Sequence, residues 1–143
     1  MAKKKVQIVI FKSSDGSCQK ITHVLLLKTN RQRGQFWQNV TGSVENDESF
    51  LASALREVQE ETQLQINQEI LKKIEVEYFF IDRKKRKVHE KVYTFITDQD
   101  QIRISEEEHT EYRWQAIDDI NEQSYLYYTN YDAFSKALKF WQS

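Results

Sequence analysis

Residues 42–64, GSVENDESFLASALREVQEETQL, are the stretch from which the rest of the chain is interpreted. If Asp47 or Asn46 caps a helix, residues 48 to about 62 form roughly four turns, since no Gly or Pro interrupts them. The apolar residues that recur at the spacing of one buried helix face are Leu51, Ala54, Leu55 and Val58. The stretch therefore predicts an amphipathic helix that packs on a core.

The same helix brings three carboxylates together near its C-terminus. Glu57 lies three residues before Glu60 and four before Glu61, so the three side chains are expected on one exposed patch. They repel one another, and the helix dipole disfavours anions at this end. A hard divalent cation removes both penalties, because Mg2+ binds oxygen ligands and keeps waters and substrate phosphates in its shell. The alternative is a solvated face on which Arg56 pairs with Glu60.

The spacing of these residues favours the metal site. The six residues that define the pattern are Gly42, Glu48, Arg56, Glu57, Glu60 and Glu61. At average residue usage they coincide by chance at roughly 10^-7 per window. The pattern resembles the Nudix box, a motif that usually has Gly at position 63. Gln63 here makes a left-handed helix C-cap costlier by about 1 kcal/mol without touching a metal ligand.

Length and composition indicate one domain, residues 1–143, with a core of ordinary size. The single Cys18 cannot form an internal disulfide, and no signal peptide or 18-residue apolar span is present, so we expect a cytoplasmic protein with no membrane partner. The net charge of -1 gives no general attraction to nucleic acid. We expect a monomer or a homodimer that binds a small-molecule triphosphate.

Apolar alternation outside the box predicts further strands and a second helix. The predicted strands are residues 3–11, 21–28, 73–81, 88–97, 102–104 and 112–117, and the predicted helix is residues 131–141. Strands dispersed around two helices imply an α/β fold with a mixed sheet and helices on both faces. The Nudix resemblance implies the corresponding α/β/α sandwich.

Two segments have alternative interpretations. Residues 82–87, DRKKRK, connect the predicted hairpin strands and form either a solvated tip or a charged flap that meets phosphates. Trp37 is either a core aromatic residue or a contact for a ring-bearing substrate.

Within the superfamily, the chain is similar to the bacterial dihydroneopterin triphosphate pyrophosphatases, also described as dATP pyrophosphohydrolases. The similarity runs through FWQNVTGSVENDES, ALREVQEET, EHTEYRW and TNYDAF. This resemblance implies that Glu57, Glu61 and Glu108 are metal ligands and that Glu60 is a further ligand or the general base. It also implies that Glu48 pairs with Arg56.

The resemblance further implies substrate contacts from Lys3, Thr41 and Thr129. One family arginine, expected at the end of the second strand, is Thr29 here. Without the resemblance, Glu106 to Glu108 would be interpreted as a solvated loop. We expect His109 to be structural or exposed rather than a ligand, because Mg2+ prefers oxygen.

These residues predict a Mg2+-dependent hydrolase, with Mn2+ as a substitute, that cleaves a triphosphate and releases pyrophosphate. Such a reaction needs charge neutralisation and positioning at phosphorus, which metal ions provide while a carboxylate accepts a proton. The favoured substrate is dihydroneopterin triphosphate, used in folate biosynthesis. The alternatives are a nucleotide house-cleaning or dinucleoside polyphosphate hydrolase and, in another class, a non-catalytic nucleotide-binding regulatory module.

Overall fold

The structure is a computed structural model that describes residues 2–143. The strands are β1 (Lys3–Ser13), β2 (Ile21–Thr29), β3 (Trp37–Gln38), β4 (Val40–Ser43), β5 (Lys72–Ile81), β6 (Lys87–Thr97) and β7 (His109–Ala116). The helices are α1 (Phe50–Thr62), α2 (Tyr128–Gln142) and the short 3-10 turns η1 (Cys18–Lys20), η2 (Ile117–Asp119) and η3 (Glu122–Ser124). One sheet has the order β3-β2-β1-β6-β5, with β4 also pairing β1 and β7 also pairing β2.

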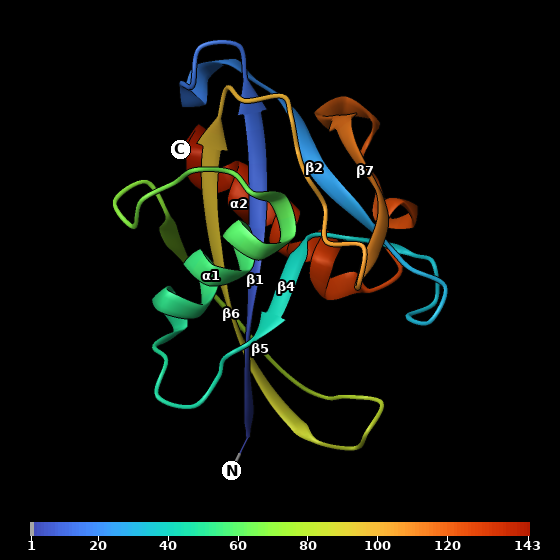
Figure 1. The fold of residues 1–143 in the computed structure, drawn as a ribbon. Helices are drawn as coiled ribbons and strands as arrows, with labels where there is room; N and C mark the ends of the chain where they lie inside the picture. The colour runs from blue at the N-terminus through green and yellow to red at the C-terminus, as the bar shows by residue number, and fades with distance from the viewer. Residues whose placement is uncertain (1) are drawn as a thin grey trace.

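The predicted mixed α/β sandwich is confirmed. β1 pairs parallel with β6 and antiparallel with β2 and β4, and α1 and α2 lie on opposite faces of the sheet (Figure 1). Alternate residues of β1 face different helices, because side chains along a strand point to opposite faces. Ile8 packs in the core that includes α1, whereas Val9 and Phe11 pack in the core that includes α2. The apolar run of β1 is therefore buried on both sides, as for a central strand.

Helix α1 begins two residues later than predicted, at Phe50, and its cap is Ser49 rather than Asp47 or Asn46. The Ser49 hydroxyl accepts a hydrogen bond from the backbone N–H of Ala52. Asp47 has a φ of 69°, outside the extended conformation that an N-cap residue adopts. At the other end, Gln63 occupies the left-handed cap position, with φ 58° and ψ 21°.

The predicted strand at residues 102–104 was wrong. This segment is irregular; Ile102 is buried against the α1 core, and the N–H of Arg103 donates to the carbonyl of Thr62 at the end of α1. Its hydrogen bonds thus go to a helix end instead of a strand. β7 also begins earlier than expected, at His109, because it pairs with β2 along its whole length.

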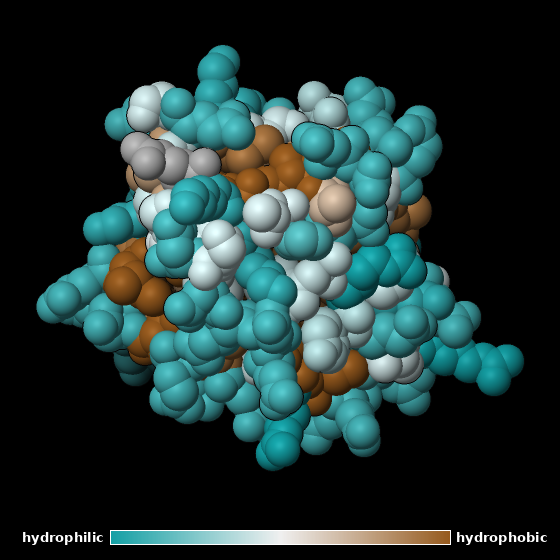
Figure 2. Space-filling view, turned by 90° about the horizontal axis from the view of Figure 1, so that it is seen from above, coloured by the Kyte–Doolittle hydropathy of each residue, from teal (hydrophilic) through white to brown (hydrophobic). Residues whose placement is uncertain are grey.

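The hairpin of β5 and β6 is confirmed, and α2 begins three residues before the predicted start. Seen from above, the surface is mostly hydrophilic, and apolar side chains show between the polar ones (Figure 2). Among residues 2–143, no helix has both the length and the apolarity needed to cross a bilayer.

The left-handed cap predicts the effect of a glycine at position 63. Gln63→Gly should raise the free energy of unfolding by about 1 kcal/mol, because glycine adopts positive φ without a Cβ clash. Gln65→Gly is the matched control, since Gln65 is also exposed but does not have positive φ. Urea denaturation measures the free energy of unfolding of both variants. Equal effects of the two substitutions on that free energy would contradict this explanation.

Candidate functional site

Arg56 ties the loop before α1 to the helix. Its guanidinium donates Nε to Oε2 of Glu48 at 2.8 Å and Nη2 to Oε1 of Glu48 at 2.9 Å. The Ser53 hydroxyl donates to the same Glu48 carboxylate, and these donors hold the pKa of Glu48 down at about 2. Nη1 of Arg56 also reaches Glu57 at 2.9 Å. The expected Glu48–Arg56 contact is present, and it fixes the direction of the first acidic side chain of the site.

The expectation that the three helix carboxylates share an exposed patch was wrong for two of them. Glu57 and Glu61 are 7% and 2% exposed, and only Glu60 lies open to solvent. Gly42 in β4 makes the burial of Glu57 possible, because a Cβ at position 42 would lie 2.0 Å from Cδ of Glu57. The backbone of β4 therefore lies directly over the Glu57 carboxylate. The prediction of an exposed patch treated the helix face as isolated and solvated, so it did not include this strand.

Glu61, Glu108 and His109 form a second group, in which Glu61 and His109 are buried and Glu108 is half-buried. Each offers a ligand atom, and these atoms lie within 4.8 Å of one another. The Nδ1 of His109 is 2.7 Å from Oε2 of Glu61, but neither atom has a well-aligned hydrogen-bond partner. The other ring nitrogen, Nε2, is 3.0 Å from Nε2 of Gln38. His109 is thus buried and touches protein groups on both sides, which agrees with the structural role expected for it.

The loop after β2 holds Glu108 beside α1. Asn30 donates its side-chain amide to the carbonyl of Glu107 at 2.7 Å, and its backbone N–H donates to the carbonyl of Glu108. Arg33 donates to Oε1 of Glu108 at 2.7 Å. Sequence reasoning gave neither Asn30 nor Arg33 a role, because the contact spans 75 residues between Arg33 and Glu108. At position 29, where the family group has arginine, the Thr29 hydroxyl instead accepts from the N–H of Phe36.

Burial and mutual repulsion make these carboxyls hard to ionise. Burial raises the pKa of Glu57 to about 7, an effect that Arg56 only partly offsets. Burial also raises the pKa of Glu61, and contact with the Glu61 carboxyl, together with burial, raises the pKa of Glu108 to about 7. Burial lowers the pKa of the His109 ring to about 4, so the ring is neutral at pH 7.

This donor set fits a hard divalent cation. The carboxylate oxygens of Glu57, Glu61 and Glu108 are the kind of ligand that such cations take, and Oε2 of Glu61 is buried without a hydrogen-bond partner. A cation would offset the repulsion that raises the carboxyl pKa values. The acidic group therefore has both the ligands and the unmet electrostatic need of a metal site.

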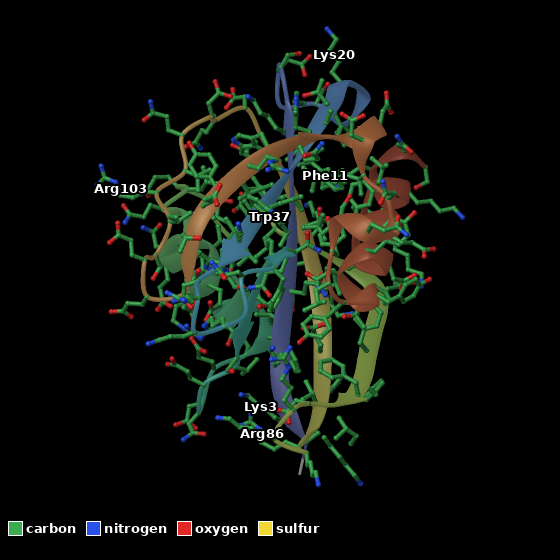
Figure 3. All side chains as sticks on the ribbon, turned by 90° about the vertical axis from the view of Figure 1, so that its right-hand side faces the viewer. Lys3, Phe11, Lys20, Trp37, Arg86 and Arg103 are labelled. Atoms are coloured by element: carbon green, nitrogen blue, oxygen red, sulfur yellow. The ribbon has the colours of Figure 1, made fainter. Side chains whose placement is uncertain are left out.

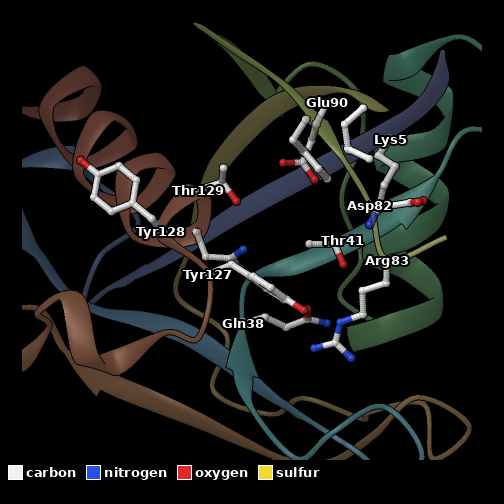
Figure 4. Close-up of a pocket in the computed structure, with 12 residues that line it drawn as sticks. Lys5, Gln38, Thr41, Asp82, Arg83, Glu90, Tyr127, Tyr128 and Thr129 are labelled. Atoms are coloured by element: carbon white, nitrogen blue, oxygen red, sulfur yellow. The ribbon is translucent and has the colours of Figure 1, made fainter. Parts of the chain in front are cut away.

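A cavity of about 470 Å3 opens on the α2 face of the sheet (Figure 4). Thr41 and Thr129, both predicted to touch substrate, are among its lining residues. Thr41 precedes Gly42, the residue that covers Glu57, and Gln38 lines the cavity while contacting His109. The cavity and the carboxylates therefore lie on opposite faces of the sheet, and β4 and the contact of Gln38 with His109 connect them.

Two other predicted substrate contacts lie outside the cavity lining. Lys3 lies at one end of the sheet beside Arg86 (Figure 3), and Lys5, two residues further along β1, lines the cavity instead. Trp37 packs against the α2 core, with the guanidinium of Arg113 4.5 Å from its ring centroid. A substrate contact for either residue stays a prediction. From the basic hairpin turn, Arg83 reaches the cavity and lies 5.9 Å from the ring of Tyr127.

The NUDIX domain model matches residues 3–137. The chain belongs to the Nudix family. Three carboxylates of its box, Glu57, Glu60 and Glu61, lie on α1. No match was found among curated protein sequences.

Solved structures share the fold of this Nudix protein. The Escherichia coli dihydroneopterin triphosphate pyrophosphohydrolase is 24% identical, with a TM-score of 0.78 over 96% of this chain and 95% of the other. The NUDIX domain of Shewanella oneidensis NrtR, complexed with ADP ribose, is 19% identical, with a TM-score of 0.77 over 98% and 88%. A Caenorhabditis elegans Ap4A hydrolase is 23% identical, with a TM-score of 0.70 over 96% of each chain.

The close approach at Gly42 predicts that Gly42→Ala impairs activity more than folding. The added methyl group has to displace the flexible end of Glu57, so kcat/KM for triphosphate hydrolysis should fall at least about tenfold, equivalent to roughly 1.4 kcal/mol. Gly16→Ala is the control for an effect on folding alone, since a Cβ at Gly16 meets nothing within 4 Å but the φ of 79° disfavours alanine, so this variant should lose stability and keep its kcat/KM. Steady-state kinetics measure kcat/KM, and circular dichroism checks that the variants fold. An unchanged kcat/KM in Gly42→Ala would contradict this explanation.

The raised pKa of Glu57 predicts a pH-dependent effect of Glu57→Gln on metal-free protein. Between the usual pKa of 4.5 and about 7, folded Glu57 retains a proton that the unfolded chain has lost, so its contribution to stability falls as pH rises. The glutamine variant should therefore gain stability relative to wild type over this range. His109, whose folded pKa is lowered, contributes in the opposite direction. Because wild type and variant both contain His109, its contribution cancels when the two are compared.

Urea denaturation at pH 5, 6, 7 and 8 with a chelator measures this difference. A constant difference across the series would show that Glu57 ionises normally in the folded protein. Addition of Mg2+ should stabilise wild type more at pH 8 than at pH 5, because protonated carboxyls are poor ligands.

Proposed function

We propose that this Nudix protein hydrolyses a phosphoanhydride in a pterin or nucleoside triphosphate and releases pyrophosphate, with Mg2+ as the cofactor and Mn2+ as a substitute. The favoured substrate is dihydroneopterin triphosphate. The observation that carries the proposal is the carboxylate cluster on α1, together with a cavity on the other face of the sheet, which neighbouring residues of β4, Gly42 and Thr41, connect to it.

The residues that would hold the cation are Glu57, Glu61 and Glu108, with Glu60 at the edge of the group. When bound, the cation supplies charge neutralisation for the phosphates and acidifies water. Glu60 is exposed and is contacted only at 3.3 Å by Arg56, so its carboxylate has free lone pairs with which to accept a proton from the attacking water. Arg56 and Glu48 orient the cluster without needing to touch the reacting phosphorus.

The cavity would hold the non-phosphate end of the substrate. Its lining combines the hydroxyls of Thr41 and Thr129 with the cations Lys5 and Arg83, which suits a polar, phosphorylated ligand. Fold similarity to a dihydroneopterin triphosphate pyrophosphohydrolase supports the pterin substrate. Similarity to an Ap4A hydrolase keeps dinucleoside polyphosphates as the second candidate.

Glu61→Gln tests the role of the cluster. Loss of one carboxylate charge should lower kcat at least about a hundredfold, or roughly 2.7 kcal/mol, with little change in folding. Glu106→Gln is the control, since Glu106 is an exposed carboxylate two residues from Glu108. Wild-type turnover in the variant at position 61 would rule out the proposed metal role.

A substrate panel tests the substrate class. Dihydroneopterin triphosphate, the deoxynucleoside triphosphates and Ap4A would be incubated with and without Mg2+, and the products separated by chromatography. The proposal expects Mg2+-dependent pyrophosphate release and the highest kcat/KM for the pterin. Preferred cleavage of Ap4A would replace it with the dinucleoside polyphosphate activity.

A further inference from the structure

A buried carboxyl group faces the cavity on the side away from the acidic cluster. Glu90 in β6 is only 3% exposed, yet it lines the cavity. Its oxygens point toward the space between Thr129 and Thr41 (Figure 4). The Oε1 atom accepts a hydrogen bond from Nε2 of Gln7 at 3.0 Å, and within the described chain no protein donor reaches Oε2.

A chain of buried amides fixes the direction of that hydrogen bond. The backbone carbonyl of Asn130 can only accept, so Asn39 turns its amide NH2 toward it, at 3.2 Å. The same NH2 donates to Oε1 of Gln7 at 2.7 Å, and Oδ1 of Asn39 accepts from the hydroxyl of Tyr125. Gln7 is therefore left with its own NH2 directed at Glu90.

The environment leaves the Glu90 carboxyl short of donors. Burial raises its pKa, and the nearby charge of Lys5, its cross-strand neighbour, only partly offsets this. A buried carboxylate is stable only when hydrogen bonds replace its lost hydration. The open Oε2 lone pairs can accept such bonds from a ligand in the cavity.

The other walls of the cavity suit a flat ring. Phe80, Ile81 and Tyr127 line it, and its volume of about 470 Å3 lies within the range of roughly 300–1,000 Å3 typical of small-molecule sites. Aromatic side chains stack on planar heterocycles, while a few polar groups select among them.

We infer that Glu90 is a specificity-determining residue, which selects substrates whose ring carries an exocyclic amino group by accepting its N–H at Oε2. The aminopyrimidinone edge shared by pterin and guanine has this chemistry. The inference rests on the proposed function for the placement of the phosphates at the acidic cluster, and it deepens that function by naming the part of the substrate that is recognised.

The test compares the binding of two free rings, pterin and lumazine, which differ in having an amino group or an oxygen at ring position 2. Wild type should bind pterin at least about tenfold more tightly, because an oxygen opposite Oε2 leaves both acceptors unpaired. Chemical-shift titration of 15N-labelled protein measures both affinities without catalysis. Equal affinities, or no binding of either ring in the cavity, would overturn the inference.

Glu90→Gln tests the inference more directly than removal of the side chain would, because it predicts a reversed preference between the two rings. The amide directed by Gln7 requires an acceptor at the Oε1 position, so the new side chain should turn its NH2 toward the cavity. The preference should then reverse toward lumazine, whose oxygen accepts that hydrogen bond. Glu75→Gln, at an exposed position of β5, should leave the pterin preference intact. An unchanged preference in the variant at position 90 would show that Glu90 is only a structural part of the amide chain.

These outcomes are separable from those of the proposed function. Ring discrimination that depends on Glu90, without any Mg2+-dependent pyrophosphate release, would reject the triphosphatase activity and leave the recognition role in place. Mg2+-dependent pyrophosphate release without ring discrimination would support the triphosphatase activity and reject the recognition role of Glu90.

Discussion

The burial of charged carboxylates beneath the backbone of the sheet is the constraint on which this site depends. Glu57 lies against Gly42, and Glu61 lies beside the buried His109, so both carboxyls are almost entirely shielded from solvent. Each buried carboxyl costs free energy unless a positive charge or a proton accompanies it. Arg56 beside Glu57 and Arg33 near Glu61 provide part of that charge, but the pKa of each carboxyl stays raised. The divalent cation that we propose would supply the rest.

The sheet also divides the site into two sides. Strand alternation places Gly42 toward α1 and Thr41 toward the cavity, so adjacent positions of β4 face the carboxylates on one side and the ring-sized space on the other. Gln38 and His109 make a second connection through the side chains. A ligand long enough to occupy both sides would have its phosphates and its ring held by different groups. Reaction chemistry and substrate choice can therefore change independently in such an arrangement.

Local sequence was sufficient for most of the secondary structure. Continuous apolar runs identified β1 and β2, which are buried on both faces, and apolar alternation identified the β5–β6 hairpin. The box spacing identified α1 and the pairing of Glu48 with Arg56, which are only eight residues apart. The strand expected at residues 102–104 failed because its apolar residues fill a gap in the core, and its backbone hydrogen bond goes to the end of α1. Alternation alone does not distinguish these two environments.

The residue types and their spacing in this chain were enough to predict the Nudix fold and the position of three acidic side chains on one helix. Tertiary packing decided which carboxylates are buried, since the strand that covers Glu57 and the loop that carries Glu108 come from distant parts of the chain. It also decided the roles open to Gln38, Arg33 and Glu90, whose partners lie between 71 and 83 residues away. No local pattern encodes such contacts, because hydrogen bonding and burial depend on which surfaces meet once the sheet has formed.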